Sequence, residues 1–393
     1  MQQPVILTVN SGSSSLKCAI ADTGNARLLL TAEANGIGHS GQVTVKDGAS
    51  RIIAQQQWEL PDVTHALQVC LPFLKTYPVV AIIHRIVQGG LHHFHTTEVI
   101  PQVMATLEEL IPLAPNHLPA QLQLIRDCQH PFPQAATLAC FDTAFHAHMP
   151  AVARYYPLPP HLREDGIIHY GFHGLSYEYI LQQLQAITPQ AARGKVLIAH
   201  LGHGASMVVT AQGRSIDTTM GLTPTGGMMM STRSGDMDPG VLLYLLNNKK
   251  MDGAALQKLF TEEAGLKGVS GQEPEVQRLL EAAPDHPRAA AAIAQFCYQA
   301  RKHLGALAAA AGGINTLVFT GGIGEHAAII RERICENMNW MGIQLDLHAN
   351  AQHAAVISAP ASAVTVRVMA TNEALVMAQH ARQWLQAHKT TGV

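Results

Sequence analysis

Charged residues are scarce in this chain, and neither sign dominates. Only 14% of the 393 residues are Asp, Glu, Lys or Arg, and 26 basic side chains face 28 acidic ones, for a formal net charge of −2. Because nucleic-acid binding depends on a basic field, this balance excludes nucleic acid as a partner. The chain is 47% hydrophobic and long enough that we expect large cores in two domains.

Signals for disulfides, metal binding and membranes are also missing. The six cysteines are scattered without a CxxC pair, which predicts reduced, buried thiols in a cytoplasmic protein. The histidines at 92, 93 and 95 lack metal-ligand spacing. The N-terminus begins as a strand without a basic segment, which argues against a signal peptide. Residues 304–324 carry no charge, but two glycines interrupt them, so a helix and then a strand is expected rather than a membrane span.

Short apolar runs alternate with helical patterns. The predicted strands are residues 5–9, 79–83, 136–141, 196–199, 316–319 and 363–369, and helices are predicted within 118–128, 178–186 and 289–311. This alternation predicts α/β layers. Polar residues follow the strands directly, among them Asn10, Arg85, Asp142 and His200. Ligands bind at the carboxyl ends of strands in such sheets, so the sequence predicts an enzyme with a cleft.

A weak internal repeat relates two hairpin-like segments. VILTVNSGSSSLKCAI (5–20) resembles VLIAHLGHGASMVVTA (196–211), about half the chain further on. This predicts two similar domains, each headed by a strand–turn–strand unit. Turns rich in glycine and serine suit phosphate oxygens, and Lys17 follows the first turn. Two ordinary glycine-rich hairpins are the alternative.

Two further segments bear on the ligand. No GxxxxGK[ST] motif occurs, but GIGEHA (322–327) follows a strand and satisfies a relaxed dinucleotide fingerprint, so an NAD-dependent dehydrogenase is one interpretation and an ATP-binding turn another. The loop 217–240 holds a single cation, Arg233. In a chain this poor in charge, Arg233 is predicted to bind an anion, with pairing to Asp236 or Asp238 as the structural alternative.

Ten motifs resemble those of the acetate/propionate kinases, in family order from end to end. They are VNSGSSSLK, HRIVQGG, LAPNHLPA, FDTAFH, YGFHGLS, HLGHGAS, DTTMGLTP, STRSGDMDP, GGIGE and TNEAL. The resemblance implies an α/β fold with two duplicated ribonuclease-H-like domains, as in actin-like ATPases, around an active-site cleft. It implies a first domain over 1–147, completed by the helix 375–393, and a nucleotide-binding domain over 148–374.

The implied activity is reversible, Mg²⁺-dependent transfer of the ATP γ-phosphate to acetate or another short acid, giving an acyl phosphate such as acetyl phosphate. A carboxylate substrate is ionised at neutral pH, so no general base is needed, and positioned cations carry out most of the catalysis. By resemblance, the catalytic residues are Arg85, Asp142, His173 and Arg233, with His173 and Arg233 stabilising the transition state. Asn10 and Glu373 would lie at Mg²⁺, which Mn²⁺ could replace.

The resemblance also implies the binding residues. The acyl pocket would contain Arg85, Val87, Asn116, Phe172 and Pro224. The nucleotide would be bound by Ser13, Lys17, His200, Gly202, His203, Gly204, Asp236, Gly322, Ile323, Gly324 and Glu325, and His117 would support the site. A homodimer and a cytoplasmic location are implied as well.

Several positions depart from the family pattern. Asn116 replaces a leucine of the acyl pocket, so propionate or a short hydroxy acid competes with acetate as substrate. His203, Ser231 and His326 change the donor site, which leaves another phosphoryl donor open. Tyr177 replaces the second histidine of the usual FHGTSH, and a non-catalytic nucleotide-binding relative is the remaining alternative.

Overall fold

The chain divides into two compact units. The computed structural model describes residues 3–12, 14–271 and 273–389. The first unit comprises 1–145 with 372–393, and the second comprises 146–371. Both divisions fall a few residues before the boundaries expected from the sequence. Within the described ranges, no helix has the length and apolar character needed to cross a membrane.

The first unit is built on an eight-stranded sheet with the order β5-β4-β3-β2-β1-β6-β8-β7. Strands β1 to β5 form an antiparallel series, whereas β6 and β8 run parallel to β1. The strands are β1 (Val5–Ser11), β2 (Ser15–Asp22), β3 (Leu28–Asn35), β4 (His39–Asp47), β5 (Ile52–Leu60), β6 (Val79–Ile86), β7 (Thr97–Glu98) and β8 (Ala136–Phe141).

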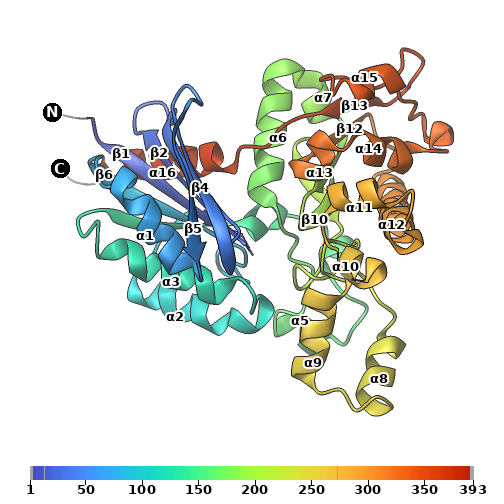
Figure 1. The fold of residues 1–393 in the computed structure, drawn as a ribbon, viewed down its shortest axis with the longest axis horizontal. Helices are drawn as coiled ribbons and strands as arrows, with labels where there is room; N and C mark the ends of the chain where they lie inside the picture. Colours follow the sequence, from blue (N-terminus) through green and yellow to red (C-terminus); the bar gives the residue numbers. More distant parts are fainter. Residues whose placement is uncertain (1–2, 13, 272, 390–393) are drawn as a thin grey trace. The chain divides into compact units, whose positions relative to one another are not determined.

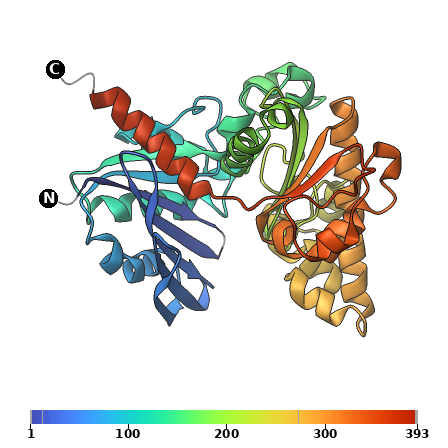
Figure 2. The ribbon, with the colours of Figure 1, turned by 90° about the horizontal axis from the view of Figure 1, so that it is seen from above.

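Helices cover both faces of this sheet. They are α1 (Val63–Leu74), α2 (Pro101–Glu109), α3 (Leu118–Gln129) and α16 (Glu373–Lys389). Alternate residues of β1, such as Leu7, join a buried core with Leu67 of α1 and Leu124 of α3. The C-terminal helix α16 packs against β1, β2, β6 and β8 from the other face (Figure 2). The last segment of the chain therefore completes the unit that the first segment began.

The second unit contains a five-stranded sheet with the order β11-β10-β9-β12-β13. Its strands are β9 (Lys195–Leu201), β10 (Ala205–Ala211), β11 (Arg214–Thr218), β12 (Thr316–Thr320) and β13 (Thr365–Val368). Its helices are α4 (Ala151–Arg154), α5 (Pro160–Glu164), α6 (Gly174–Ile187), α7 (Pro189–Arg193), α8 (Pro239–Asn247), α9 (Gly253–Lys258), α10 (Gly265–Ser270), α11 (Val276–Ala282), α12 (Pro287–Ala310), α13 (Gly321–His326), α14 (Ala328–Cys335) and α15 (Leu347–Ala351). The longest of them, α6 and α12, lie on opposite faces of the sheet (Figure 1).

The two sheets share a five-stranded core topology. In the first unit the order β3-β2-β1-β6-β8 begins with antiparallel pairs and ends with parallel ones, and β11-β10-β9-β12-β13 does the same in the second. The hairpins β1–β2 and β9–β10 occupy equivalent places, so the weak sequence repeat is confirmed as a duplicated topology. A dinucleotide-binding half starting at β12 needs two further strands, and in the described residues only β13 follows, so the NAD interpretation is not supported.

Candidate active site

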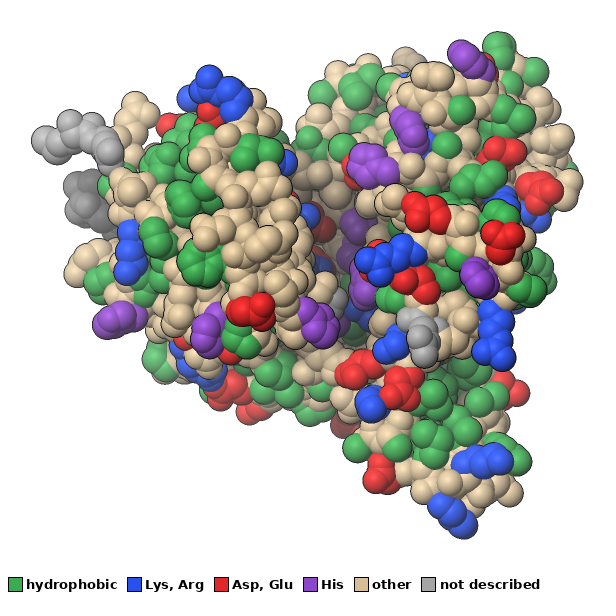
Figure 3. All heavy atoms as spheres, in the orientation of Figure 1, with side chains coloured by type: hydrophobic (Ala, Val, Ile, Leu, Met, Phe, Trp, Pro, Cys, Tyr) green, Lys and Arg blue, Asp and Glu red, His purple; other side chains and the backbone are tan. Residues whose placement is uncertain are grey.

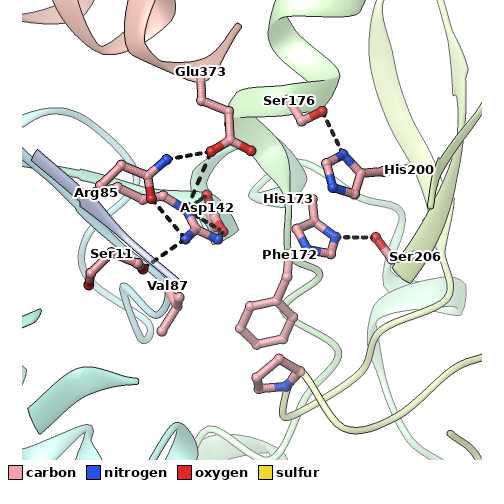
Figure 4. Close-up of polar contacts among 12 residues, drawn as sticks. Ser11, Arg85, Val87, Asp142, Phe172, His173, Ser176, His200, Ser206 and Glu373 are labelled. Atoms are coloured by element: carbon pink, nitrogen blue, oxygen red, sulfur yellow. Dashed lines mark hydrogen bonds and ion pairs between the residues drawn. The ribbon is translucent and has the colours of Figure 1, made fainter. Parts of the chain in front are cut away.

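An arginine–carboxylate cluster lies at the carboxyl ends of the parallel strands of the first unit. Its four members are Asn10 of β1, Arg85 of β6, Asp142 directly after β8, and Glu373 at the start of α16. Figure 4 labels Arg85, Asp142 and Glu373. Arg85 binds Asp142 with Nε, 3.0 Å from Oδ1, and with a second donor to Oδ2. Asn10 donates from Nδ2 to Glu373 over 2.7 Å and accepts from Arg85 over 3.2 Å.

Neighbouring carboxylates keep Arg85 ionised in spite of its burial. The Arg85 side chain is 11% exposed and that of Asp142 only 1%. Burial lowers the pKa of Arg85, but the carboxylates of Asp142 and Glu373 raise it by more, so it ends above the ordinary arginine value. The cluster therefore presents a permanent, rigidly held cation at a strand end.

Other residues predicted for the site lie around this cluster. Lys17 is exposed and directly opposite Asn10 in the β1–β2 register. The backbone N–H of Val87 donates to Gln121 in the first turn of α3, and Asn116 lies in the exposed turn just before that helix. Ser13, which we expected to contact the nucleotide, lies outside the described residues.

A stacked-histidine cluster forms in the second unit. The rings of His173 and His200 stack with centroids 4.3 Å apart. Each ring meets a serine hydroxyl through Nδ1, His173 at Ser206 and His200 at Ser176, both over 2.8 Å (Figure 4). His173 occupies the left-handed region, at φ 59° and ψ 25°, immediately before α6. A non-glycine residue held there is unusual and points to a constrained functional position.

Gly202 and Gly204 lie in the turn between β9 and β10, beside these rings. A Cβ on Gly204 would lie 3.4 Å from an Arg233 guanidinium nitrogen and 3.5 Å from His173 Nε2. A Cβ on Gly202 would lie 3.8 Å from His200 Nε2. The turn thus brings its backbone close to one cation and two imidazoles, an arrangement that suits an anion.

The loop 217–240 holds Arg233 in place mainly through its backbone. Arg233 donates to the carbonyl of Pro224 over 3.0 Å. Asp236 accepts from the N–H of Gly227 over 2.6 Å and returns its own N–H to the Gly227 carbonyl. Asp238 caps α8 by accepting from Gly240. Both carboxylates that we considered as partners for Arg233 therefore accept hydrogen bonds from backbone amides.

The glycine-rich segment after β12 is a short helix with internal support. Glu325 accepts from the N–H of Gly321 over 3.0 Å, so its carboxylate caps α13. The guanidinium of Arg331, fully buried, donates to the carbonyls of Gly324 and Glu325 and to Asn350. His203 is exposed and pairs loosely with Glu275, at 3.8 Å.

Supporting residues in this unit escaped the sequence analysis. His146 is buried, its Nδ1 meets Ser215 Oγ, and its Nε2 donates to the carbonyl of Phe172, next to His173. Burial lowers the pKa of His146 to about 4, and the bond to Phe172 opposes the shift only in part, so the ring is neutral. Ser206 occupies the same position in the segment 196–211 as Ser15 does in 5–20, and His146 is the last residue of the motif FDTAFH. Neither pattern indicates which side chain these residues contact.

Comparison with known proteins identifies the family. The two-domain α/β architecture matches solved structures of actin-like ATPase fold: an acetate kinase from Porphyromonas gingivalis (TM-score 0.84, 33% identity, 97% of this chain and 100% of that one) and a propionate kinase from Francisella tularensis (TM-score 0.88, 33% identity, 97% and 99%). The Acetokinase family model matches residues 5–379, and the chain belongs to that family.

Curated relatives agree over the full length. An acetate kinase from Rhodopseudomonas palustris is 42% identical, covering 96% of this chain and 97% of its own. Acetate kinase 1 of Neisseria meningitidis serogroup A is 38% identical over 96% and 98%. The family resemblance seen in ten sequence motifs is thereby confirmed.

Proposed function

We propose that this protein transfers the γ-phosphate of ATP reversibly to the carboxylate of acetate or another short acid, giving an acyl phosphate and ADP. One observation carries the proposal: Arg85 is held at the end of β6 by Asp142, and Arg233 is held beside the glycine turn by the carbonyl of Pro224. The reaction requires no general base. An ionised carboxylate is already a nucleophile, so the barrier lies in bringing two anions together. Family membership supports the same activity.

The proposed mechanism is direct in-line transfer. Arg85 and Arg233 neutralise charge on the carboxylate and on the transferring phosphoryl group. The Nε2 of His173 donates a hydrogen bond to an equatorial phosphoryl oxygen. Donors held in advance at the positions where charge develops lower the barrier without reorganisation, and removing one typically costs about 10²–10³ in kcat.

The arginine–carboxylate cluster fits a magnesium ion bound largely through water and phosphate. No group of three or more His, Cys, Asp or Glu side chains in the described ranges could form a full protein cage. Mg²⁺ characteristically uses one or two carboxylates and keeps several waters. Glu373, with Asn10 and Asp142 beside it, would hold the ion, or Mn²⁺ in its place. When bound, the metal neutralises charge on the phosphate oxygens.

We assign the nucleotide to the second unit and the acyl group mainly to the first. His200, Gly202, His203 and Gly204 would surround the phosphates, and the segment from Gly322 to Glu325 would lie under the adenosine, with Asp236 near it. Lys17, and Ser13 by its motif, would complete the phosphate end. The acyl pocket would comprise Val87, Asn116, Phe172 and Pro224. On this assignment the first domain runs over 1–147 with 375–393, and the second over 148–374.

The acyl acceptor need not be acetate. Asn116 introduces an amide where the family pattern has leucine, and a pocket that can donate a hydrogen bond favours substrates that use it. The propionate kinase similarity supports a three-carbon acid as an alternative. Lactate or glycolate would be preferred if the Asn116 amide contacts the substrate.

Assembly and location are proposed on separate grounds. α8 buries none of its residues, and Val241, Leu242, Leu243, Tyr244 and Leu246 are all at least 38% exposed, which forms a hydrophobic patch at the surface (Figure 3). A symmetric pair of such patches can cover itself, so we propose a homodimer through α8.

All six cysteines are free and buried, which supports a cytoplasmic location.

The deciding experiment traps acyl phosphates as hydroxamates with Mg·ATP. The panel is acetate, propionate, butyrate, glycolate and lactate, and Arg233→Ala is the blank. We expect acetate or propionate to give the highest kcat/KM and the variant to be inactive. A hydroxy acid in the lead would make Asn116→Leu the next variant, with acetate then gaining. If every acid fails with ATP but succeeds with pyrophosphate, the donor assignment is wrong. If all donors fail while ATP binds, the protein is a non-catalytic nucleotide-binding relative.

A further inference from the structure

Tyr177 is linked through one serine to His173, the residue proposed to donate a hydrogen bond to the phosphoryl group. Tyr177 lies on α6, one helical turn after His173, and is fully buried. Its hydroxyl hydrogen-bonds to Ser206 Oγ. Ser206, also fully buried, meets His173 Nδ1 over 2.8 Å. The three side chains form a line from the core to the glycine turn, and the ring of Tyr177 is held edge-on against His146.

The relative acidities of these groups determine which one donates in each hydrogen bond. A phenol, with a pKa near 10, is much more acidic than an aliphatic hydroxyl, so Tyr177 is the better donor and Ser206 the better acceptor between them. Among the described residues, the Ser206 hydroxyl contacts Tyr177 and the His173 ring only, so once Tyr177 donates to it, the buried Ser206 proton has Nδ1 of His173 as its acceptor. A neutral imidazole that accepts at Nδ1 carries its proton on Nε2.

The other ring nitrogen faces the proposed reaction. His173 Nε2 lies 3.5 Å from the position of a Cβ on Gly204, and an Arg233 nitrogen lies 3.4 Å from the same point. A hydrogen-bond donor at Nε2 is the form that can stabilise a phosphoryl oxygen, whereas the other neutral tautomer would present a lone pair to an anion.

We propose that Tyr177 is a positioning residue that acts through Ser206 to hold His173 in the Nε2–H tautomer. The consequence for catalysis rests on the proposed phosphoryl transfer, but the tautomer itself does not.

The test measures the tautomer and the kinetics separately in the full-length protein. ¹⁵N-histidine labelling identifies the His173 ring nitrogens by comparison with His173→Asn, at a pH about two units above the ordinary histidine pKa of roughly 6.5. We expect the wild-type proton on Nε2. Tyr177→Phe keeps the ring packed on His146 but removes the hydroxyl that sets the direction of the two hydrogen bonds, so we expect the tautomers to mix.

In Tyr177→Phe the imidazole of His173 stays in place, but its Nε2 carries a proton in only part of the molecules, and this determines the expected kcat. Tyr177→Phe should lower kcat about tenfold, less than the 10²–10³ seen when a donor is removed, with both KM values within about twofold. Ser206→Ala should mix the tautomers in the same way. Tyr179→Phe is the matched control, because this tyrosine lies on the same helix and is only partly buried. It should match wild type in both measurements.

Two results would overturn the inference. One is a wild-type His173 with its proton on Nδ1. The other is an unchanged tautomer in Tyr177→Phe, and a lower kcat alongside it would then reflect a merely structural role. If the wild-type enzyme forms no acyl phosphate from any acid, the proposed function fails, while the NMR comparison still decides whether the relay exists.

Discussion

At the residue scale, Arg85 and Asp142 depend on each other. They come from neighbouring parallel strands and are both largely removed from solvent. Two buried charges offset each other's desolvation only while both are present, so removing one partner leaves an uncompensated charge. This pair therefore has a structural role in addition to the catalytic role we propose for Arg85.

Arg85→Gln is expected to lower the free energy of unfolding by about 3–5 kcal/mol, because Asp142 stays ionised in a buried place. Adding Asp142→Asn should restore most of that loss while activity stays absent. Urea unfolding of the two variants measures the difference. Arg51→Gln is the control, since Arg51 pairs with Asp47 at the surface, and its midpoint should not move. Equal destabilisation of the single and double variants would contradict the argument.

At the element scale, one glycine sets how closely α10 approaches the loop that carries Arg233. Gly265 begins α10 with φ +64°, and a Cβ there would lie 2.2 Å from the Met230 carbonyl oxygen and 2.8 Å from that of Arg233. Both clashes are with backbone atoms, which cannot rotate away. Any larger residue must therefore displace the Arg233 loop.

Gly265→Ala should lower kcat about 10–100-fold, because displacement of a catalytic group by about 1 Å can cost two orders of magnitude. Gly253→Ala is the matched control: this glycine begins α9, and its added Cβ would meet no atom within 4 Å. The hydroxamate assay compares the two variants. Full activity in Gly265→Ala would show that the Arg233 position tolerates loop movement.

At the scale of the whole molecule, the last helix of the chain packs on the first strand within the first unit. α16 is far from β1 in sequence, yet Val376, Met377 and Ala378 are fully buried, and the helix packs on β1 and β6. The face of the first sheet opposite α1 and α3 is therefore covered only once α16 has been synthesised. Its stability should depend on α16 as much as on its own strands.

Met377→Asp should destabilise the first unit by more than about 3 kcal/mol, because it buries an unpaired carboxylate. Gln383→Asp places the same group on an exposed position of the same helix and should have little effect. Limited proteolysis of the two variants, with the cleaved segments identified by mass, measures the difference. Cleavage confined to residues 146–371 in Met377→Asp would contradict the prediction.

The proposed homodimer makes a second prediction at this scale. Leu243→Glu, in the α8 patch, should convert the protein from twice the 42.2 kDa chain mass to the single-chain mass in light scattering. Leu347→Glu is the control, since Leu347 lies on α15 and is 57% exposed, as Leu243 is. A wild-type protein of single-chain mass would refute the dimer.

The residues that end the strands are predictable from the sequence alone. Apolar strand patterns are local, so the positions of Asn10, Arg85, Asp142 and His200 at carboxyl ends follow from the residues around each of them. The same local patterns predicted the duplicated hairpins and the break between helix and strand at Gly312 and Gly313. Motif order then identified the family, which a pattern of apolar residues alone could not have done.

How those strand ends combine depends on tertiary packing. The partnership of Arg85 with Asp142 depends on the register between β6 and β8, and Glu373 reaches Asn10 from the opposite end of the chain. Likewise, Ser206 meets Tyr177 only because β10 packs beside the start of α6. Side-chain hydrogen bonds have a reach of about 3 Å, so contacts between distant segments depend on packing that no local pattern encodes.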